Sequence, residues 1–428
     1  MISVVIHHRD LNYENNESYY NIKNEVFPVF IFTPEQTEKN DYFSPSSFHF
    51  LLRVLKGFEV MNYFFGEHGE MIKKILLELK KKYDKIELIE NGDVSPYAKK
   101  RERITRAICE EMGVKFRLTY SQFLCKKGIL TKSDGHAYKV FGPFLKNFKS
   151  NKIKKLKTNK NKLISLPFSM DFQSIEKLLQ EKKLIQAPIK SGVKEEAKKK
   201  LSNYNFADYE TSRDKLSLRT SEMSEYIKYN VLSPVEIFNH ANCLYKEQLL
   251  WREFYFYCVD HYHVDYKKKA DTLPDFNKLK WNRDSKTLKD WEKGETGIPI
   301  VDAAMRQLKQ ENYIHNRARM ITATYLVHYK KIHWKEGEKI FAQNLRDYDY
   351  SSNLGGWQWV SGHETHSNPY FKIFSLGSQA RRFDPKCEYV KRYVKELRNS
   401  SVEEIIKKNA SLDHLRKKRI NEIKKVVY

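Results

Sequence analysis

The sequence predicts an α/β region with a parallel sheet, followed by an all-helical region. Residues 1 to about 130 alternate short β-type runs with helical patterns, which is the order of strands and crossover helices in a parallel sheet. After Tyr204 the apolar spacing becomes i, i+3, i+4, i+7, the period of an amphipathic helix, and the β-type runs stop. All six tryptophans lie after Tyr204, and such a concentration is ordinarily core packing.

The elements of the first region follow in order along the chain. Apolar runs at 3–6, 27–32 and 86–89 predict strands. The amphipathic pattern from about 69 to 83 predicts a helix that crosses over the sheet between the last two strands. We therefore expect residues 1–130 to form an α/β domain.

The chain then changes character before the helical region begins. From about Lys149 to Tyr204 it becomes Lys-rich and weakly patterned, which is typical of a long solvated connection. We therefore predict a basic linker over 131–204 and an all-helical domain over 205–428.

The composition is that of a basic globular protein. The 428 residues include 78 Lys and Arg against 54 Asp and Glu, for a formal net charge of +24. The content of 40% apolar and 14% aromatic residues excludes a disordered or fibrous chain. The charge favours polyanionic partners, although a coding bias towards Lys and Asn gives the same excess.

Several classes of protein are excluded by absent signals. No stretch approaches the ~20 consecutive apolar residues that span a bilayer, and the first ten residues carry charges where a secretory signal is apolar. We therefore expect an intracellular protein without a membrane partner or an obligate protein partner, and a monomer. The five cysteines are scattered and form no CxxC pair, so neither a disulfide framework nor a metal site is predicted.

One helical segment combines groups that suit a planar polar ligand. At 3.6 residues per turn, Tyr245, Gln248, Arg252 and Tyr255 share a helix face, with Trp251 beside Gln248. An amide, a guanidinium and large aromatic rings together are an unusual choice for a helix core. A partly exposed helix anchored by a tryptophan gives the same pattern, and this alternative stays open.

Two further segments place polar groups at close spacing. On a helix, Asn316 and Met320 lie one turn apart and Arg319 adjoins Asn316. Asp347 and Asp349 precede an amide and a Gly pair that lets the backbone approach a ligand, although alone this is a polar turn. No Ser/His/Asp arrangement, GxxxxGK loop or HExxH motif accompanies these carboxylates, so a hydrolase is not indicated.

These segments occur in the order seen in the photolyase/cryptochrome family, which the chain resembles over nearly its whole length. The matching motifs are WREFY at 251–255, GIPIVDAAMR at 297–306, the segments 315–320 and 353–359, HRDL at 8–11 with the Glu-Asn pair at 14–15, SPYA at 95–98 and YKVFGPF at 138–144. The chain is most similar to class I cyclobutane pyrimidine dimer photolyases. The resemblance implies a Rossmann-like antenna-type domain followed by a helical FAD-binding domain.

The resemblance also implies which residues bind FAD. The loop that cradles the phosphates corresponds to Thr220, Ser221, Glu222, Met223 and Ser224, and Glu222 stands where a basic or neutral residue is commoner. An Arg paired with a carboxylate beside the ring can stabilise negative charge on reduced flavin. The other implied contacts are Tyr209, Tyr245, Gln248, Arg252, Asn316, Arg319, Asp347, Tyr348, Asp349 and Asn353. Of these, Asn353 matches the residue that faces the flavin N5, where repair enzymes usually carry Asn.

The implied substrate is a flipped-out pyrimidine dimer. Trp251, Trp359, Asn316 and Met320 match the residues that hold it, and Gln248 stands where these enzymes have Glu. Since an amide cannot offer a carboxyl proton, slower repair is expected. The (6-4) photolyases also carry Gln there, but they have paired histidines where this chain has His315-Asn316, and a further His at the Met320 position.

The remaining implied sites serve electron transfer, DNA and an antenna. Trp281, Trp334 and Trp357 match an electron relay to the photoexcited flavin, although their spacing alone also fits three core tryptophans. The basic positions that clamp DNA phosphates correspond to Arg213, Arg317 and Lys372. Folate-binding relatives have Asn-Glu where this chain has Ser95-Pro96, so a folate antenna is not supported; a deazaflavin, a second flavin or no antenna stays open.

The resemblance therefore implies the activity of a deoxyribodipyrimidine photo-lyase. The protein would repair cyclobutane pyrimidine dimers by light-driven electron transfer from excited reduced FAD to the flipped-out dimer. The alternatives left open are a cryptochrome blue-light photoreceptor and a (6-4) photolyase.

Overall fold

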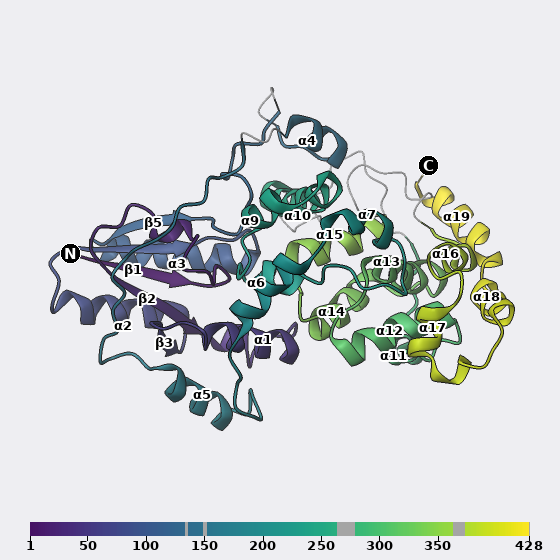
Figure 1. Ribbon diagram of the computed structural model, residues 1–428, viewed down its shortest axis with the longest axis horizontal. Coiled ribbons are helices and arrows are strands. Elements are labelled where there is room, and N and C mark those ends of the chain that lie inside the picture. Colours follow the sequence, from purple (N-terminus) through teal and green to yellow (C-terminus); the bar gives the residue numbers. More distant parts are fainter. Residues whose placement is uncertain (133–135, 149–151, 263–278, 363–372, 428) are drawn as a thin grey trace. The chain divides into compact units, whose positions relative to one another are not determined.

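The computed structural model describes residues 1–132, 136–148, 152–262, 279–362 and 373–427 (Figure 1). Two compact units are present. The first contains Met1–Tyr204 and Met223–Val264, and the second contains Asn205–Glu222 and Asp265–Tyr428.

The first unit is built on a five-stranded parallel sheet with the strand order β3-β2-β1-β4-β5. The strands are β1 (Ile2–His7), β2 (Glu25–Phe32), β3 (Asn62–Phe65), β4 (Ile86–Asn91) and β5 (Lys115–Thr119). In register, Ile2 of β1 lies opposite Glu25 of β2 and Ile86 of β4. Because β1 is buried on both faces, its sequence is mostly apolar, and its polar residues Ser3 and His7 are buried as well. The sheet confirms the predicted α/β class.

Alternate residues of the strands face two different apolar clusters. Val4 and its neighbours on one face pack with the apolar sides of α2 (His68–Lys80) and α3 (Pro96–Glu111). Val5 on the other face packs with Tyr19 of the 3₁₀ helix η1 (Glu17–Tyr19). The remaining short elements of this part are η2 (Pro34–Gln36) and α1 (Pro45–Leu55). The helix predicted at 69–83 is α2.

Residues 131–204, which the sequence analysis assigned to a basic and weakly patterned linker, contain three helices. These are α4 (Phe141–Asn147), α5 (Phe172–Glu181) and α6 (Val193–Asn203). Each buries only two or three apolar side chains, such as Ile175 and Leu179 of α5, and presents its charged residues outward. So few apolar positions per helix give a weak periodic signal, which explains why the helices were not predicted.

Three helices beyond the sheet complete the first unit, and helices form the described part of the second. The first unit adds α8 (Ser224–Lys228), α9 (Pro234–His240) and α10 (Cys243–Tyr262). The second unit contains η4 (Phe206–Asp208), α7 (Tyr209–Ser212), α11 (Ser285–Lys293), α12 (Pro299–Glu311), α13 (Asn316–Thr324), the π-helical turn η6 (Tyr325–Tyr329), α14 (Trp334–Asn344), α15 (Tyr350–Ser361), α16 (Leu376–Phe383), α17 (Glu388–Tyr393), η8 (Lys395–Leu397), α18 (Val402–Ala410) and α19 (His414–Val427). Within the described ranges, no helix has the length and apolar character needed to cross a membrane.

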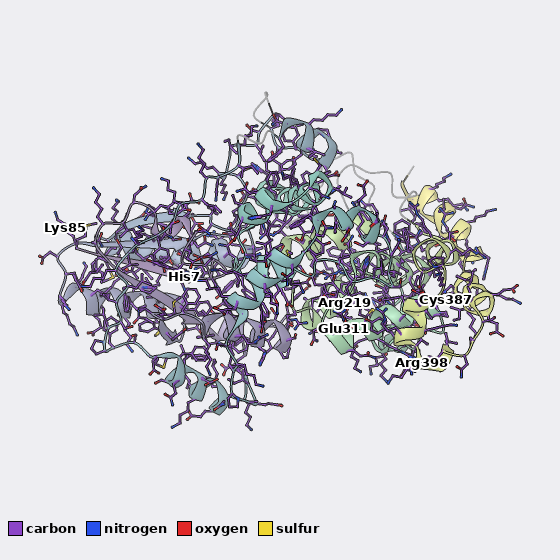
Figure 2. The ribbon with its side chains drawn as sticks, in the orientation of Figure 1. His7, Lys85, Arg219, Glu311, Cys387 and Arg398 are labelled. Carbon is purple, nitrogen blue, oxygen red and sulfur yellow. The ribbon has the colours of Figure 1, made fainter. Side chains whose placement is uncertain are left out.

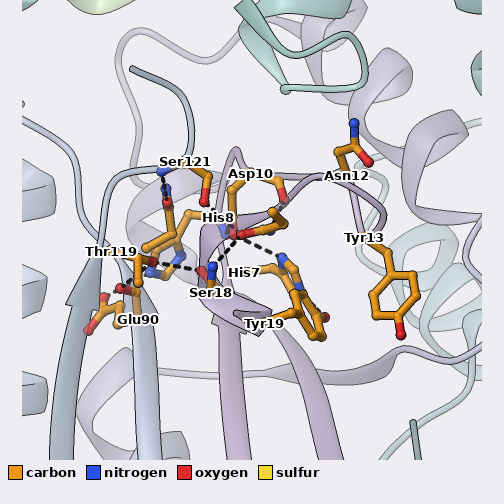
Figure 3. Close-up of polar contacts among 12 residues, drawn as sticks. His7, His8, Asp10, Asn12, Tyr13, Ser18, Tyr19, Glu90, Thr119 and Ser121 are labelled. Carbon is orange, nitrogen blue, oxygen red and sulfur yellow. Dashed lines mark hydrogen bonds and ion pairs between the residues drawn. The ribbon is translucent and has the colours of Figure 1, made fainter. Parts of the chain in front are cut away.

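A buried polar cluster lies where β1 ends (Figures 2 and 3). His7 Nε2 is 2.6 Å from the hydroxyl of Tyr19, and His7 Nδ1 is 3.2 Å from Oδ2 of Asp10. Asp10 also accepts hydrogen bonds from the backbone N–H of His8 and the amide of Asn16. Burial disfavours the charged form of Asp10, but the ring of His7 and these hydrogen bonds lower its pKa to about 2.

The low pKa of Asp10 predicts a defined loss of stability in acid. Because the folded pKa lies below the unfolded value, the ionised carboxylate stabilises the fold above about pH 4, and this contribution disappears as the pH falls towards 2. Asp10→Asn is expected to lower the free energy of unfolding by about 2 kcal/mol at pH 7 and to flatten its pH dependence below pH 4. Urea unfolding across this pH range measures both effects, with Asp84→Asn at an exposed position as the control. Equal pH profiles for wild type and Asp10→Asn would contradict the assignment.

Candidate functional site

Helix α10 of the first unit contains four of the candidate site residues, as the sequence predicted. These are Tyr245, Gln248, Trp251 and Arg252. The indole of Trp251 stacks on the ring of Phe141 from α4, with ring centroids 3.7 Å apart and an interplanar angle of 16°. Phe141 therefore covers one face of this indole and fixes its plane.

Two charged residues of the same helix hold it to the segment that follows β5. Arg252 donates from Nη1 to the carbonyl oxygen of Gln122 at 2.9 Å. The carboxylate of Glu253 accepts the backbone N–H groups of Leu124 and Cys125 at 3.0 and 3.1 Å. Glu253 is 5% exposed, and burial raises its pKa. These contacts set the rotation of α10, and with it the direction of the candidate side chains.

In the second unit, α13 begins at the predicted Asn316. His315 caps the helix, because its Nδ1 accepts the backbone N–H of Arg317 at 3.1 Å. Burial, followed by the charge of Arg317, lowers the pKa of His315 to about 4, so the ring is neutral at pH 7 and can act as this acceptor. Asn316 is exposed, and Met320 lies one turn later with its sulfur 3.7 Å from Nη1 of Arg317.

The predicted pair of Arg319 and Asp347 is present. Nη2 of Arg319 lies 3.1 and 2.8 Å from the two carboxylate oxygens of Asp347, and Nε donates to the carbonyl of Ile314 at 3.0 Å. The carboxylate side chain is 7% exposed and the guanidinium side chain 26%. The guanidinium is therefore fixed from two sides, with part of its surface open.

Helix α15 places the next two candidates. Asp349 is the N-cap and accepts the backbone N–H of Ser352 at 2.9 Å. Asn353, 8% exposed, donates its amide nitrogen to the carbonyl oxygen and Oε1 of Glu338 in α14, at 3.2 and 2.8 Å. Since the amide nitrogen is engaged by Glu338, the carbonyl oxygen is the group that Asn353 can offer to a ligand.

The candidate phosphate loop is partly balanced in charge. Glu222, at a left-handed φ of 49°, lies 2.8 Å from Nη1 of Arg219, and Arg219 also lies 3.3 Å from Glu311 (Figure 2). The hydroxyl of Thr220 is 3.3 Å from that of Tyr313. Ser221, Met223 and Ser224 continue this loop into α8, and Tyr209 begins α7 beneath the guanidinium of Arg213.

The candidate electron-transfer tryptophans lie around α14. The ring of His333 lies 5.1 Å from that of Trp281 and 5.8 Å from that of Trp334. One turn further along the helix, a Cβ atom on Gly337 would lie 2.2 Å from the ring of Trp357. Trp357 therefore packs directly on the α14 backbone, which only Gly permits at this position. Trp359 points elsewhere and contacts Phe374, with ring centroids 6.2 Å apart.

The groups present match the chemistry of a flavin dinucleotide. Arg319 offers a fixed positive charge and Asn353 an amide carbonyl, while the candidate loop offers hydroxyls suited to phosphate oxygens. A Cβ atom on Gly356 would meet no atom within 4 Å, so the backbone of α15 is open at this point. Glu222 is the one unfavourable charge in the loop, and its ion pair with Arg219 compensates for it. In the described ranges, no group of three His, Cys, Asp or Glu residues is arranged to hold a metal ion.

Two predicted site residues remain to be placed, and the sequence analysis did not identify three residues that hold the candidate side chains in place. Lys372 lies outside the described residues, and Tyr348 directly precedes the Asp349 cap. The missed partners are Phe141, Glu253 and Glu338. Phe141 and Glu253 stand inside motifs that the sequence analysis quoted, and a lone Glu among apolar helix residues is a signal that could have identified the second.

The comparisons with known proteins agree with this geometry. The DNA photolyase model matches residues 4–161, and a model described as the FAD binding domain of DNA photolyase matches residues 245–427. A deoxyribodipyrimidine photo-lyase of Buchnera aphidicola subsp. Baizongia pistaciae is 28% identical over 91% of this chain and 87% of its own length. A deoxyribodipyrimidine photo-lyase of Alkalihalophilus pseudofirmus is 41% identical over 47% of this chain. This match covers 42% of the length of that relative.

A solved structure extends the match to the whole fold. The crystal structure of the Sulfolobus tokodaii photolyase, which holds two FAD molecules, has a TM-score of 0.83 and 25% identity, and the match covers 99% of both chains. The predicted FAD-binding domain and the predicted photolyase/cryptochrome family are thus confirmed. This chain belongs to the DNA photolyase/cryptochrome family.

Proposed function

We propose that this protein is a deoxyribodipyrimidine photo-lyase that uses light to repair cyclobutane pyrimidine dimers in DNA. The observation that carries the proposal is the arrangement on α13. One turn of this helix presents Asn316 and Met320 together, and the same turn contains Arg319, fixed by Asp347. A single rigid element thus presents groups for a lesion and a charge for a flavin.

The residues of the second unit have distinct roles towards FAD. Arg319 provides positive charge beside the flavin ring, and Asp347 keeps its guanidinium in place. Asn353 presents its carbonyl oxygen, because Glu338 holds the amide nitrogen. When bound and reduced, FAD would supply the electron that light drives into the dimer, and would take it back once the cyclobutane ring has split. The remaining proposed contacts in the second unit are Tyr209, Thr220, Ser221, Glu222, Asn316, Tyr348 and Asp349, and those in the first unit are Met223, Ser224, Tyr245, Gln248 and Arg252.

Aromatic and amide side chains hold the flipped-out dimer. Trp251 and Trp359 provide flat apolar surfaces, and the Phe141 stack keeps Trp251 in one plane. Gln248 and Asn316 provide hydrogen bonds to the pyrimidine carbonyl and imide groups, without a carboxyl proton. Flipping costs least at a damaged base pair, so the lesion is selected by structure rather than by sequence.

Two further sets of residues support repair. Trp281, Trp334 and Trp357 pass electrons inward to keep the flavin in its reduced state, and His333 lies between the first two rings. Arg213 and Arg317 bind phosphates beside the lesion. The net charge of +24 draws the protein towards DNA.

The test is a lesion-specific repair assay under blue light. Purified, photoreduced protein is given an oligonucleotide with one thymine cyclobutane dimer, and in parallel the same oligonucleotide with a (6-4) lesion, each with a dark control. We expect light-dependent repair of the dimer alone. Repair of only the (6-4) lesion would contradict the substrate assignment. Repair of neither lesion by protein that still photoreduces would assign the chain to the cryptochromes.

A further inference from the structure

Two arginines from different helices of the second unit, Arg317 and Arg382, lie over the ring of Phe383, and a third, Arg213, lies over that of Tyr209. The guanidinium carbons of Arg317 and Arg382 lie 4.3 and 5.1 Å from the ring centroid of Phe383, which is 3% exposed. The carbonyl oxygen of Phe383 accepts the backbone N–H of Leu216 at 3.0 Å, and this bond joins the end of α16 to the turn that carries Arg213. We call Arg213, Arg317 and Arg382 the arginine cluster.

The carboxylate of Asp214 forms an ion pair with Arg317 of this cluster. Its Oδ1 is 2.6 Å from Nη2 of Arg317, and the two side chains are 42% and 18% exposed respectively. Burial opposes ionisation of Asp214, but the hydrogen bond from Arg317 and the charges of the arginine cluster lower its pKa. The carboxylate is therefore ionised at neutral pH and occupies the guanidinium edge that a phosphate would use.

We propose that Asp214 is an exchangeable counter-ion of the arginine cluster, which a DNA phosphate must displace from Arg317 when the protein binds DNA. This inference rests on the proposed binding of DNA by Arg213 and Arg317, and it adds Arg382 to the phosphate contacts. Carboxylate and phosphate both use the planar fork of a guanidinium, so they compete for the same donors. Asp214 acts through Arg317, by competing for its guanidinium, and does not itself bind the DNA.

The exchange has a consequence for salt dependence as well as for affinity. When a phosphate takes Arg317, Asp214 loses its partner and attracts a cation from solution. This uptake offsets part of the cation release that normally accompanies a phosphate contact. Because a backbone phosphate is present whether or not a base is damaged, Asp214 weakens binding to damaged and undamaged DNA by the same factor.

The experiment compares Asp214→Asn with a matched control, Glu396→Gln. Glu396 also pairs with an arginine of the second unit, Arg306, at 2.7 Å, and the two side chains are 58% and 22% exposed. Both substitutions raise the net charge by one. Binding of the full-length protein to a duplex oligonucleotide, with and without a thymine dimer, is measured by fluorescence anisotropy from 50 to 300 mM salt.

We expect Asp214→Asn to bind both duplexes about fivefold more tightly at ~0.1 M salt, with a salt dependence steeper by about 0.9 in log Kd against log salt. Glu396→Gln should match wild type in both respects. In an Arg317→Gln background, Asp214→Asn should no longer tighten DNA binding, because the guanidinium for which Asp214 and the phosphate compete has been removed. Asp214→Ser is a second variant that removes the charge, and thermal unfolding verifies that each variant is folded.

Three results would overturn the proposal. Unchanged or weaker binding by folded Asp214→Asn and Asp214→Ser would mean that the carboxylate orients Arg317 and does not compete for it. If Glu396→Gln tightened DNA binding equally, the change in net charge alone would explain the effect. Tightening that persists without Arg317 would exclude exchange at that side chain. DNA binding requires no light, so the two assays are independent. If the protein repaired no lesion but Asp214→Asn still bound DNA more tightly, the photo-lyase assignment would be refuted and the proposed exchange would stand.

Discussion

Glu253→Ala is expected to lower the free energy of unfolding by about 4 kcal/mol, because it removes the acceptor of two buried backbone N–H groups. Each unpartnered N–H costs ~1–3 kcal/mol. Glu253→Gln should lose about half as much, since an amide offers one acceptor and turns its NH2 group towards the other N–H. Urea unfolding of the protein without flavin measures both losses.

A matched variant on the same helix separates this contact from a general effect on α10. Glu247→Ala removes a carboxylate that is only half-buried, and its expected change is within about 0.5 kcal/mol. If Glu253→Ala were as stable as Glu247→Ala, the carboxylate would not anchor the helix. The predicted loss also reaches the site, since α10 carries Gln248 and Trp251.

Asn353→Asp is expected to cost about 3 kcal/mol of unfolding free energy at pH 7.5, because it places a second carboxyl group within hydrogen-bond distance of Glu338. Two buried carboxylates cannot both ionise at this separation, so the pKa of the introduced group rises. With a folded pKa above the unfolded value, the penalty is absent below about pH 4 and grows as the pH rises through the folded pKa. Urea unfolding at pH 4.5 and 7.5 measures this dependence.

The control for this variant is Asn344→Asp on α14. Asn344 is half-buried and donates to the carbonyl of Ile340 within its own helix, so its replacement introduces the same charge without a facing carboxylate. A loss below about 1 kcal/mol with little dependence on pH is expected. If the two variants behaved alike, the contact of Asn353 with Glu338 would not determine the orientation of the amide.

The fold was predictable where burial imposes a simple pattern. Strands β1, β2 and β4 each contain a short, mostly apolar run, because these strands are covered on both faces. Strand β5 was not singled out because it begins with exposed Lys115 and also contains Arg117, and β3 has only four residues. Short or polar edge strands are specified by pairing with their neighbours, which a local pattern does not contain.

The candidate site was predictable for residues whose relation is local. The spacing within α13 and within α10 follows from the helical period, so Asn316 and Met320 were placed correctly one turn apart. The contacts of Trp251 with Phe141 and of Asn353 with Glu338 join different elements, and only tertiary packing brings them together. The family resemblance indicated what these residues do, but not what holds them in place.

The way the chain passes between the two units has a consequence for how the protein is made. Residues 205–222 belong to the second unit, although 223–264 return to the first. On the ribosome, the first unit therefore stays incomplete until α10 has emerged, and the early piece of the second unit waits for more than a hundred later residues. Cutting the gene at the end of α6 would leave the first product without residues 223–264 of its unit, so the first unit should not be obtained as a separately stable protein from that product.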